Sequence, residues 1–114
     1  MSDYAMYILV NKDIEMSPGK LAGQVAHAAV DYLLLNRRVY TGNDFLYWKE
    51  TPEKTKIILY AKSSLLEELE KANYVTVRDL GKTELEPNTL TCVCAGVYKK
   101  DTRPKFIKRL RLVS

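Results

Sequence analysis

The feature that most constrains the fold is an almost wholly apolar run near the start of the chain, Tyr4–Val10. It does not alternate polar with apolar residues, so a strand here would be buried on both sides. Lys56–Ala61 is a second short run of the same kind. A strand that is apolar on both faces needs cover on both, which helices usually supply. The two runs therefore predict strands of a sheet that lies between two layers of helices.

Helix signals separate the strand-like runs. Ser17-Pro18 is typical of a helix start, with Ser as N-cap and Pro in the first turn, and nothing breaks the stretch that follows until about Asn36. The other expected elements are a short helix through Phe45, Tyr47 and Trp48, a helix over Leu65–Ala72 capped by Ser63-Ser64, strands over Tyr74–Arg78 and Thr89–Val97, one or two helical turns over Arg103–Lys108, and a terminal strand over Leu110–Val113.

This order predicts an α/β fold of three layers, α/β/α, with a mixed four- to five-stranded sheet and helices on both faces. With 114 residues the chain fits one domain, residues 1–114. No apolar run approaches the roughly 20 residues of a membrane span. Met1-Ser2-Asp3-Tyr4 also lacks the basic start of a secretory signal. We therefore expect a cytoplasmic protein without a membrane partner.

Positive charge is concentrated at one end of the chain. From Gly96 to Ser114, seven basic residues stand against Asp101, a local charge of +6 in a chain whose net charge is +4. Basic charge distributed in this way favours a polyanionic partner, most simply nucleic acid. The alternative is a solvated tail that keeps the protein in solution.

Metal and thiol chemistry have few candidate residues. The chain has two cysteines, Cys92 and Cys94, and one histidine, His27. A structural zinc site needs four such ligands, so we expect no metal. The Cys-x-Cys spacing places both thiols on one face of a strand, where they are interpreted as small buried hydrophobic residues rather than a redox pair.

The first helix carries a narrow polar stripe. At 100° per residue, Lys20, Gln24, His27 and Asp31 fall on one side, while the other positions through Val30 are apolar or small. We therefore expect this helix to be buried almost all round, with the stripe as its solvent edge or as a functional surface. The position of Lys20 favours the interpretation of the stripe as a functional surface. A first-turn cation opposes the helix dipole by about 0.3–1 kcal/mol, unless an anion such as a phosphate or an oxyanion occupies the site.

A second candidate segment follows the third expected strand. Asp79 stands at the end of that strand, and Gly81 provides a turn directly after it. Functional groups of α/β proteins gather at such strand ends, although Asp is also an ordinary turn former. From these residues alone, the two interpretations remain open.

Four segments of the chain follow one another in an order that is typical of a known family. They are Asp13-Ile14-Glu15-Met16, Gly19-Lys20-x-Ala22-x-Gln24-x-x-His27-Ala28, Asp79-x-Gly81-Lys82-Thr83-Glu84-Leu85 and Thr91-Cys92-Val93. This ordered set covers essentially the whole chain and resembles the type 2 peptidyl-tRNA hydrolase family. The chain departs from the family pattern at Asn11, where a basic residue is usual, at Gly23 and Lys82, and over Cys94–Thr102, which replaces a Gly/Pro-rich segment.

The resemblance implies an esterase that acts on peptidyl-tRNA and releases free tRNA and peptide. It implies attack by an oriented water without a metal or an organic cofactor, tRNA as the substrate partner, and a homodimer. The positions that match the family's functional residues are Lys20, Gln24, His27, Asp79, Thr83 and Thr91. The altered Cys94–Thr102 segment and Asn11 keep a second hypothesis open, a non-catalytic tRNA- or protein-binding module on the same fold.

Side-chain chemistry gives these matched positions expected roles. Lys20 suits a terminal phosphate or the oxyanion, and Gln24 suits the ester carbonyl or the peptide backbone. Asp79 can orient the water and accept its proton, while Thr83 and Thr91 fix that water or the 3′ adenosine. Histidine changes charge close to neutral pH, which makes His27 the alternative base. We expect Lys20 and Asp79 to approach each other across a shared cleft.

Overall fold

The computed structural model describes residues 3–35, 42–81 and 85–114. The elements follow the predicted order, with boundaries that shift by a few residues. They are β1 (Tyr4–Asn11), α1 (Pro18–Leu34), α2 (Asp44–Glu50), β2 (Lys56–Ala61), α3 (Ser63–Lys71), β3 (Val75–Asp79), β4 (Thr89–Lys99), the 3-10 helix η2 (Lys100–Thr102) and α4 (Lys105–Lys108). Asn36, the expected end of the first helix, lies outside the described residues.

The sheet is mixed and has the strand order β2-β1-β4-β3. β1 pairs with β2 in parallel, and β4 is antiparallel to both β1 and β3. β1, β2 and β3 therefore run in the same direction. Their carboxyl ends lie together with the amino end of β4 at one end of the sheet. In an α/β fold, this end of the sheet is the usual place for a ligand site.

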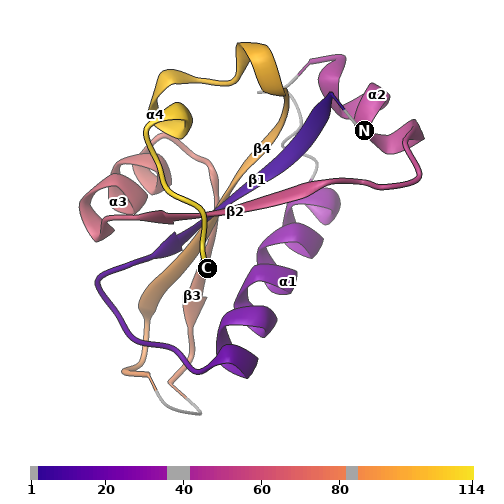
Figure 1. The fold of residues 1–114 in the computed structure, drawn as a ribbon. Helices are drawn as coiled ribbons and strands as arrows, with labels where there is room; N and C mark the ends of the chain where they lie inside the picture. Colours follow the sequence, from indigo (N-terminus) through magenta and orange to yellow (C-terminus); the bar gives the residue numbers. More distant parts are fainter. Residues whose placement is uncertain (1–2, 36–41, 82–84) are drawn as a thin grey trace.

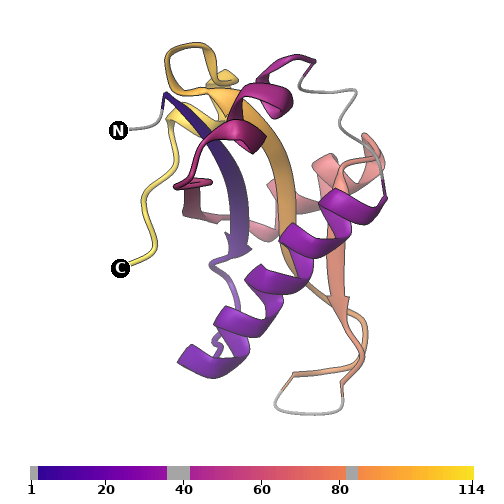
Figure 2. The same cartoon turned by 90° about the vertical axis from the view of Figure 1, so that its right-hand side faces the viewer.

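Helices cover both faces of the sheet, which confirms the three-layer prediction (Figures 1 and 2). On one face α1 and α2 pack against residues such as Ile8 and Val77. On the other face α3 and α4 pack against residues such as Leu9 and Val93, through Leu66 and Ile107. Adjacent residues of β1 thus point into different cores, because successive side chains of a strand alternate. This is the physical origin of the apolar run in the first strand.

The expected terminal strand is reduced to a single bridge. Leu112 forms an isolated antiparallel bridge with Leu59, so the sheet has four strands among the described residues rather than five. Tyr60 N donates to Arg111 O over 2.9 Å, and Val113 N donates to Ile58 O over 3.0 Å. The C-terminal segment therefore lies along β2 and covers an edge that would otherwise be open to another strand.

The surroundings of α1 correct one expectation. Ser17 caps the helix as predicted, with its hydroxyl accepting from Lys20 N over 3.3 Å. However, only Ala28 and Tyr32 are fully buried, and apolar residues such as Leu34 are exposed. The helix is not buried all round, because only its inner side packs on the sheet and its small and apolar outer side stays open among the described residues.

The start of α3 is also held differently from the prediction. The helix begins at Ser63, after Lys62, and no side chain of Lys62 caps it. Instead the Asp13 carboxylate, in the segment between β1 and α1, accepts from Ser63 N over 2.8 Å. The cap comes from a residue fifty positions away in the sequence, which local pattern cannot reveal.

Candidate active site

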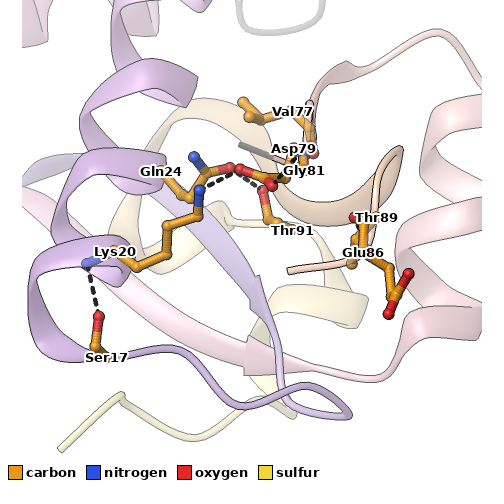
Figure 3. Close-up of polar contacts among 9 residues, drawn as sticks. All are labelled: Ser17, Lys20, Gln24, Val77, Asp79, Gly81, Glu86, Thr89 and Thr91. Atoms are coloured by element: carbon orange, nitrogen blue, oxygen red, sulfur yellow. Dashed lines mark hydrogen bonds and ion pairs between the residues drawn. The ribbon is translucent and has the colours of Figure 1, made fainter. Parts of the chain in front are cut away.

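Three elements bring polar side chains together at the carboxyl ends of the parallel strands (Figure 3). Lys20 and Gln24 project from the first two turns of α1. Asp79 is the last residue of β3, and Thr91 lies near the amino end of β4. Residues from distant parts of the sequence thereby form one cluster, as the sequence predicted for Lys20 and Asp79.

The centre of the cluster is an ion pair between the Lys20 ammonium and the Asp79 carboxylate. Both side chains are shielded from solvent, with exposed fractions of 13% for Lys20 and 6% for Asp79. The second carboxylate oxygen of Asp79 accepts from Gly81 N over 2.8 Å. The hydrogen bond from Lys20, supported by the one from Gly81, lowers the pKa of Asp79 despite its burial. Asp79 is therefore held as a carboxylate.

The ion pair explains the position of Lys20 in the first turn of α1. The positive end of a helix dipole disfavours a cation unless an anion lies beside it. The carboxylate of Asp79 is that anion. The expected partner of Lys20 was a ligand phosphate or oxyanion, and the structure shows that the chain also supplies an anion of its own.

Thr91 faces α1 because of a β-bulge. Val77 pairs with Cys92 and Arg78 pairs with Leu90, so Thr91 is the extra residue between them. A bulge of this kind turns a side chain away from its regular direction. The Thr91 hydroxyl lies 2.5 Å from Gln24 Oε1 and 3.1 Å from Val77 O, and Thr91 is fully buried. Figure 3 shows the amide nitrogen of Gln24 on the side away from Thr91.

The loop that follows Asp79 is anchored at both ends. Asn88 N donates to Asp79 O over 2.6 Å. Arg78 points to the other side of the sheet, where it binds both carboxylate oxygens of Glu70 at 2.9 and 2.7 Å and also donates to Asn88 O. A bidentate pair of this kind fixes orientation as well as position. The backbone that carries Asp79 is thus tied to α3 and to the end of its own loop.

Of the six predicted site residues, His27 is not brought into this cluster, and the place of Thr83 is not described. His27 is 53% exposed and pairs with Asp31 one turn further along α1, at 3.1 Å. The polar stripe of α1 therefore divides into an inner pair, Lys20 and Gln24, and an outer pair, His27 and Asp31. Thr83, together with Lys82, lies outside the described residues.

The structure places both cysteines in the sheet. Cys92 and Cys94 are free, buried and on one face of β4, as predicted. Burial raises the pKa of each thiol to about 12, which keeps both protonated at neutral pH. Among the described ranges, no three metal-ligating side chains of His, Cys, Asp or Glu lie together.

The segment that departs from the family pattern, Cys94–Thr102, lies away from the cluster. Its first part continues β4 and pairs with the amino-terminal half of β1, where Gly96 lies opposite Tyr7 at a second bulge. Gly96 has a positive φ of 106°, which suits glycine. The departure therefore changes the opposite end of the sheet from Asp79.

Sequence reasoning missed two features of the cluster, the bulge at Thr91 and the amide of Gly81. No residue pattern marks a bulge in an apolar strand. The Asp79-Leu80-Gly81 segment did carry a signal, because an Asp side chain readily accepts from the backbone two residues later.

The ion pair predicts how Asp79 titrates. The carboxyl group of an ordinary aspartate has a pKa of about 3.9. Carbon NMR of the Asp79 carboxyl should give a pKa below that ordinary value, because Lys20 stabilises the charged form. Lys20→Met removes the largest cause of this shift and should raise the pKa. By linkage, the ion pair contributes stability above the pKa of the unfolded chain and loses it as the pH falls through the lower folded value. A Lys20→Met spectrum with an unchanged pKa would contradict this assignment.

Comparisons with known proteins show the family of this chain. The sequence matches the family described as Peptidyl-tRNA hydrolase PTH2 over residues 4–113. A protein of Methanococcus vannielii is 32% identical over 96% of this chain and 99% of its own length. One of Sulfurisphaera tokodaii is 37% identical over 95% and 97%, and one of Staphylothermus marinus is 42% identical over 83% of each chain. All three are named peptidyl-tRNA hydrolase. The match spans every described strand and helix, and the chain belongs to the peptidyl-tRNA hydrolase PTH2 family.

Proposed function

We propose that this chain, as one domain over residues 1–114, hydrolyses the ester bond of peptidyl-tRNA and releases free tRNA and peptide. Its family membership supports the activity. The observation that carries the proposal is the Lys20–Asp79 ion pair next to Gln24 and Thr91. A shielded carboxylate beside an ammonium group and an amide offers both parts that ester hydrolysis needs, a group that orients water and donors for an oxyanion.

Asp79 is the group proposed to orient the attacking water. Each of its oxygens already accepts one hydrogen bond, from Lys20 or from Gly81, and keeps a further lone pair for a water. The lowered pKa makes Asp79 a weak base, so its main contribution is position. The water oxygen bonds to the ester carbonyl carbon, the bond to the ribose oxygen breaks, and the water proton passes by way of Asp79 to that departing oxygen.

Lys20 and Gln24 are proposed to stabilise the oxyanion that forms on the ester carbonyl. Lys20 supplies positive charge, and Gln24 supplies an amide N–H from the side turned away from Thr91. Thr91 is then a positioning residue, because its hydroxyl holds the other end of the Gln24 amide. Thr83 keeps its predicted role on the water or the 3′ adenosine. His27 is left outside this mechanism because its partner is Asp31.

The decisive experiment is hydrolysis of a defined N-blocked aminoacyl-tRNA. Wild-type protein should release the tRNA, and Asp79→Ala should not, whereas Asp101→Ala, which removes an exposed carboxylate of η2, should behave as wild type. Tight tRNA binding by a wild-type protein that leaves the ester intact would support the non-catalytic module instead. We also propose that no metal is needed, since Lys20 supplies the positive charge. Activity lost on dialysis against a chelator would contradict this.

We propose a cytoplasmic location, because peptidyl-tRNA arises in translation and both cysteines stay as free thiols. Within the described residues, no helix is long and apolar enough to cross a membrane. Fractionation of cells that express the tagged chain would test the location.

Binding of tRNA should depend steeply on salt. The proposed contacts are made mainly to phosphates, through Lys20, Lys82 and the basic C-terminal segment, in which Lys105 and Lys108 are exposed. Log affinity should fall linearly with log salt, and the double variant Lys105→Gln/Lys108→Gln should reduce the slope by about 1 for each phosphate that a lysine no longer neutralises. tRNAs of different sequence should bind alike. Fluorescence anisotropy over a salt series measures both, and an affinity indifferent to salt would overturn the proposal.

We propose that the protein forms a homodimer. Of the expected apolar surface, Phe45 and Trp48 lie in the core, but Leu46 and Tyr47 are more than half exposed. The ring contact between Tyr32 and Phe45 packs α1 beside α2, and Leu34 of α1 is itself 74% exposed. Sedimentation velocity should show a dimer that Leu34→Lys dissociates and Ser64→Lys, on α3, does not. A monomer at every concentration would overturn the proposal.

A further inference from the structure

A cavity of about 760 Å³ lies beside the candidate active site. Its floor includes Val10 and Tyr60, which are register partners at the carboxyl ends of β1 and β2. Val10 belongs to the core on the α1 face, so the cavity lies on the same face as the Lys20–Asp79 pair. α1 packs mainly against β4, β3 and β1, and the cavity lies at the carboxyl end of β2. The volume is in the range of small-ligand sites.

The first turns of α1 separate the cavity from the candidate active site. Ser17 and Leu21 line the cavity, whereas Lys20 and Gln24 face Asp79 and Thr91. Neither Lys20 nor Asp79 is a lining residue, so the cavity is not the cleft expected between them. Lys20 and Leu21 are nevertheless consecutive. A ligand that passes over this turn would reach from the cavity to the ion pair.

The lining combines a flat ring, apolar side chains and two cations against one carboxylate, that of Glu15. Tyr60 is half-buried, Met16 and Leu21 give apolar surface, and Lys12 and Arg111 are exposed at the rim. Arg111 does not belong to a free tail, because its carbonyl accepts from Tyr60 N and the next residue bridges to Leu59. An aromatic ring stacks on a nucleobase, and arginine binds phosphate.

We propose that this cavity binds the last nucleotides of the single-stranded 3′ end of tRNA, with a base on Tyr60 and phosphates at Arg111 and Lys12. This rests on the proposed function, and it adds where the tRNA end is held. The two cations favour the nucleotide part of the substrate over its peptide part, which carries no regular negative charge. The terminal ribose would then lie over the first turn of α1, with its ester at the Lys20–Asp79 pair.

The test uses a 5′-fluorescent trinucleotide, cytidine-cytidine-adenosine, and measures its affinity without turnover. Arg111→Gln and Tyr60→Leu should each weaken binding by about 5- to 20-fold, the scale of removing one charged hydrogen bond or one stacked base. Tyr60→Phe keeps the ring and should retain affinity. Lys49→Gln loses the same charge on α2, outside the cavity lining, and should bind as wild type. Thermal melts confirm that each variant folds.

A second readout is the hydrolysis of N-blocked aminoacyl-tRNA. Arg111→Gln should raise KM by a similar factor and leave kcat within about twofold, because it removes binding that is equal in ground and transition states. Unchanged trinucleotide affinity in both Arg111→Gln and Tyr60→Leu would overturn the cavity proposal and would leave the proposed hydrolysis untouched. An N-acetyl peptide amide that loses affinity in Tyr60→Leu, with the trinucleotide unaffected, would assign the cavity to the peptide and also overturn it. Trinucleotide binding that depends on Arg111 in a protein without hydrolysis would sustain the cavity and refute the hydrolase.

Discussion

Replacing Asp79 by Asn, or Lys20 by Met, is expected to lower kcat/KM for an N-blocked aminoacyl-tRNA by on the order of 10²-fold or more, the scale of removing a general base or an oxyanion donor. Asp79→Asn removes the acceptor that orients water, and Lys20→Met removes both the oxyanion donor and the partner that keeps Asp79 ionised. Because the two groups act as a unit, the double variant should lose less than the product of the two single losses.

Controls separate this effect from loss of charge and loss of fold. Asp101→Asn and Lys49→Met remove one exposed charge each and should keep activity within about twofold. Since the ion pair is largely shielded, each single variant leaves an uncompensated charge and should melt at a lower temperature than the double variant. His27→Gln should remain within about threefold of wild type. A 10²-fold loss in His27→Gln, with a mild loss in Asp79→Asn, would transfer the role of base to His27.

Gly81→Ala is expected to damage the site from the loop. Gly81 has a φ of 76°, and a Cβ added there would lie 2.6 Å from Pro87 Cγ and 2.7 Å from Pro87 Cα. A positive φ costs an alanine roughly 1–2 kcal/mol, and the backbone clash adds to this. The loop must shift, which moves the amide that Gly81 donates to Asp79. Activity should fall by more than about tenfold, and denaturant unfolding should show a loss of at least about 1–2 kcal/mol.

Gly23→Ala is the matched control for stability. Gly23 lies inside α1, and a Cβ there would meet nothing within 4 Å. Alanine favours a helix interior over glycine by about 1 kcal/mol, so this variant should be as stable as wild type or more stable. Equal unfolding curves for Gly81→Ala and wild type would show that the loop tolerates the added carbon, and would remove the argument that Gly81 positions Asp79.

The sequence by itself predicted the layers of the fold and the residues of the candidate site. The apolar runs Tyr4–Val10 and Lys56–Ala61 indicated two strands, of which the first is central and the second lies at the end of the strand order, and Ser17-Pro18 marked the start of α1. Hydrophobic periodicity and helix caps are local properties of the sequence, so these features can be predicted without a structure. The order of motifs also selected Lys20, Gln24, Asp79 and Thr91, and the oddity of a lysine in the first turn of a helix indicated a nearby anion.

The tertiary structure decided which of these residues meet. His27 shares the stripe of Lys20 in sequence, but the packing of α1 turns it outward to Asp31. The bulge that aims Thr91 at Gln24 depends on the pairing of β3 with β4, and the cap of α3 comes from Asp13. The edge of β2 takes up the C-terminal segment through a single bridge rather than a fifth strand. Each outcome rests on interactions between residues far apart in the chain, whose geometry is fixed only when the sheet and helices pack, and no local pattern records it.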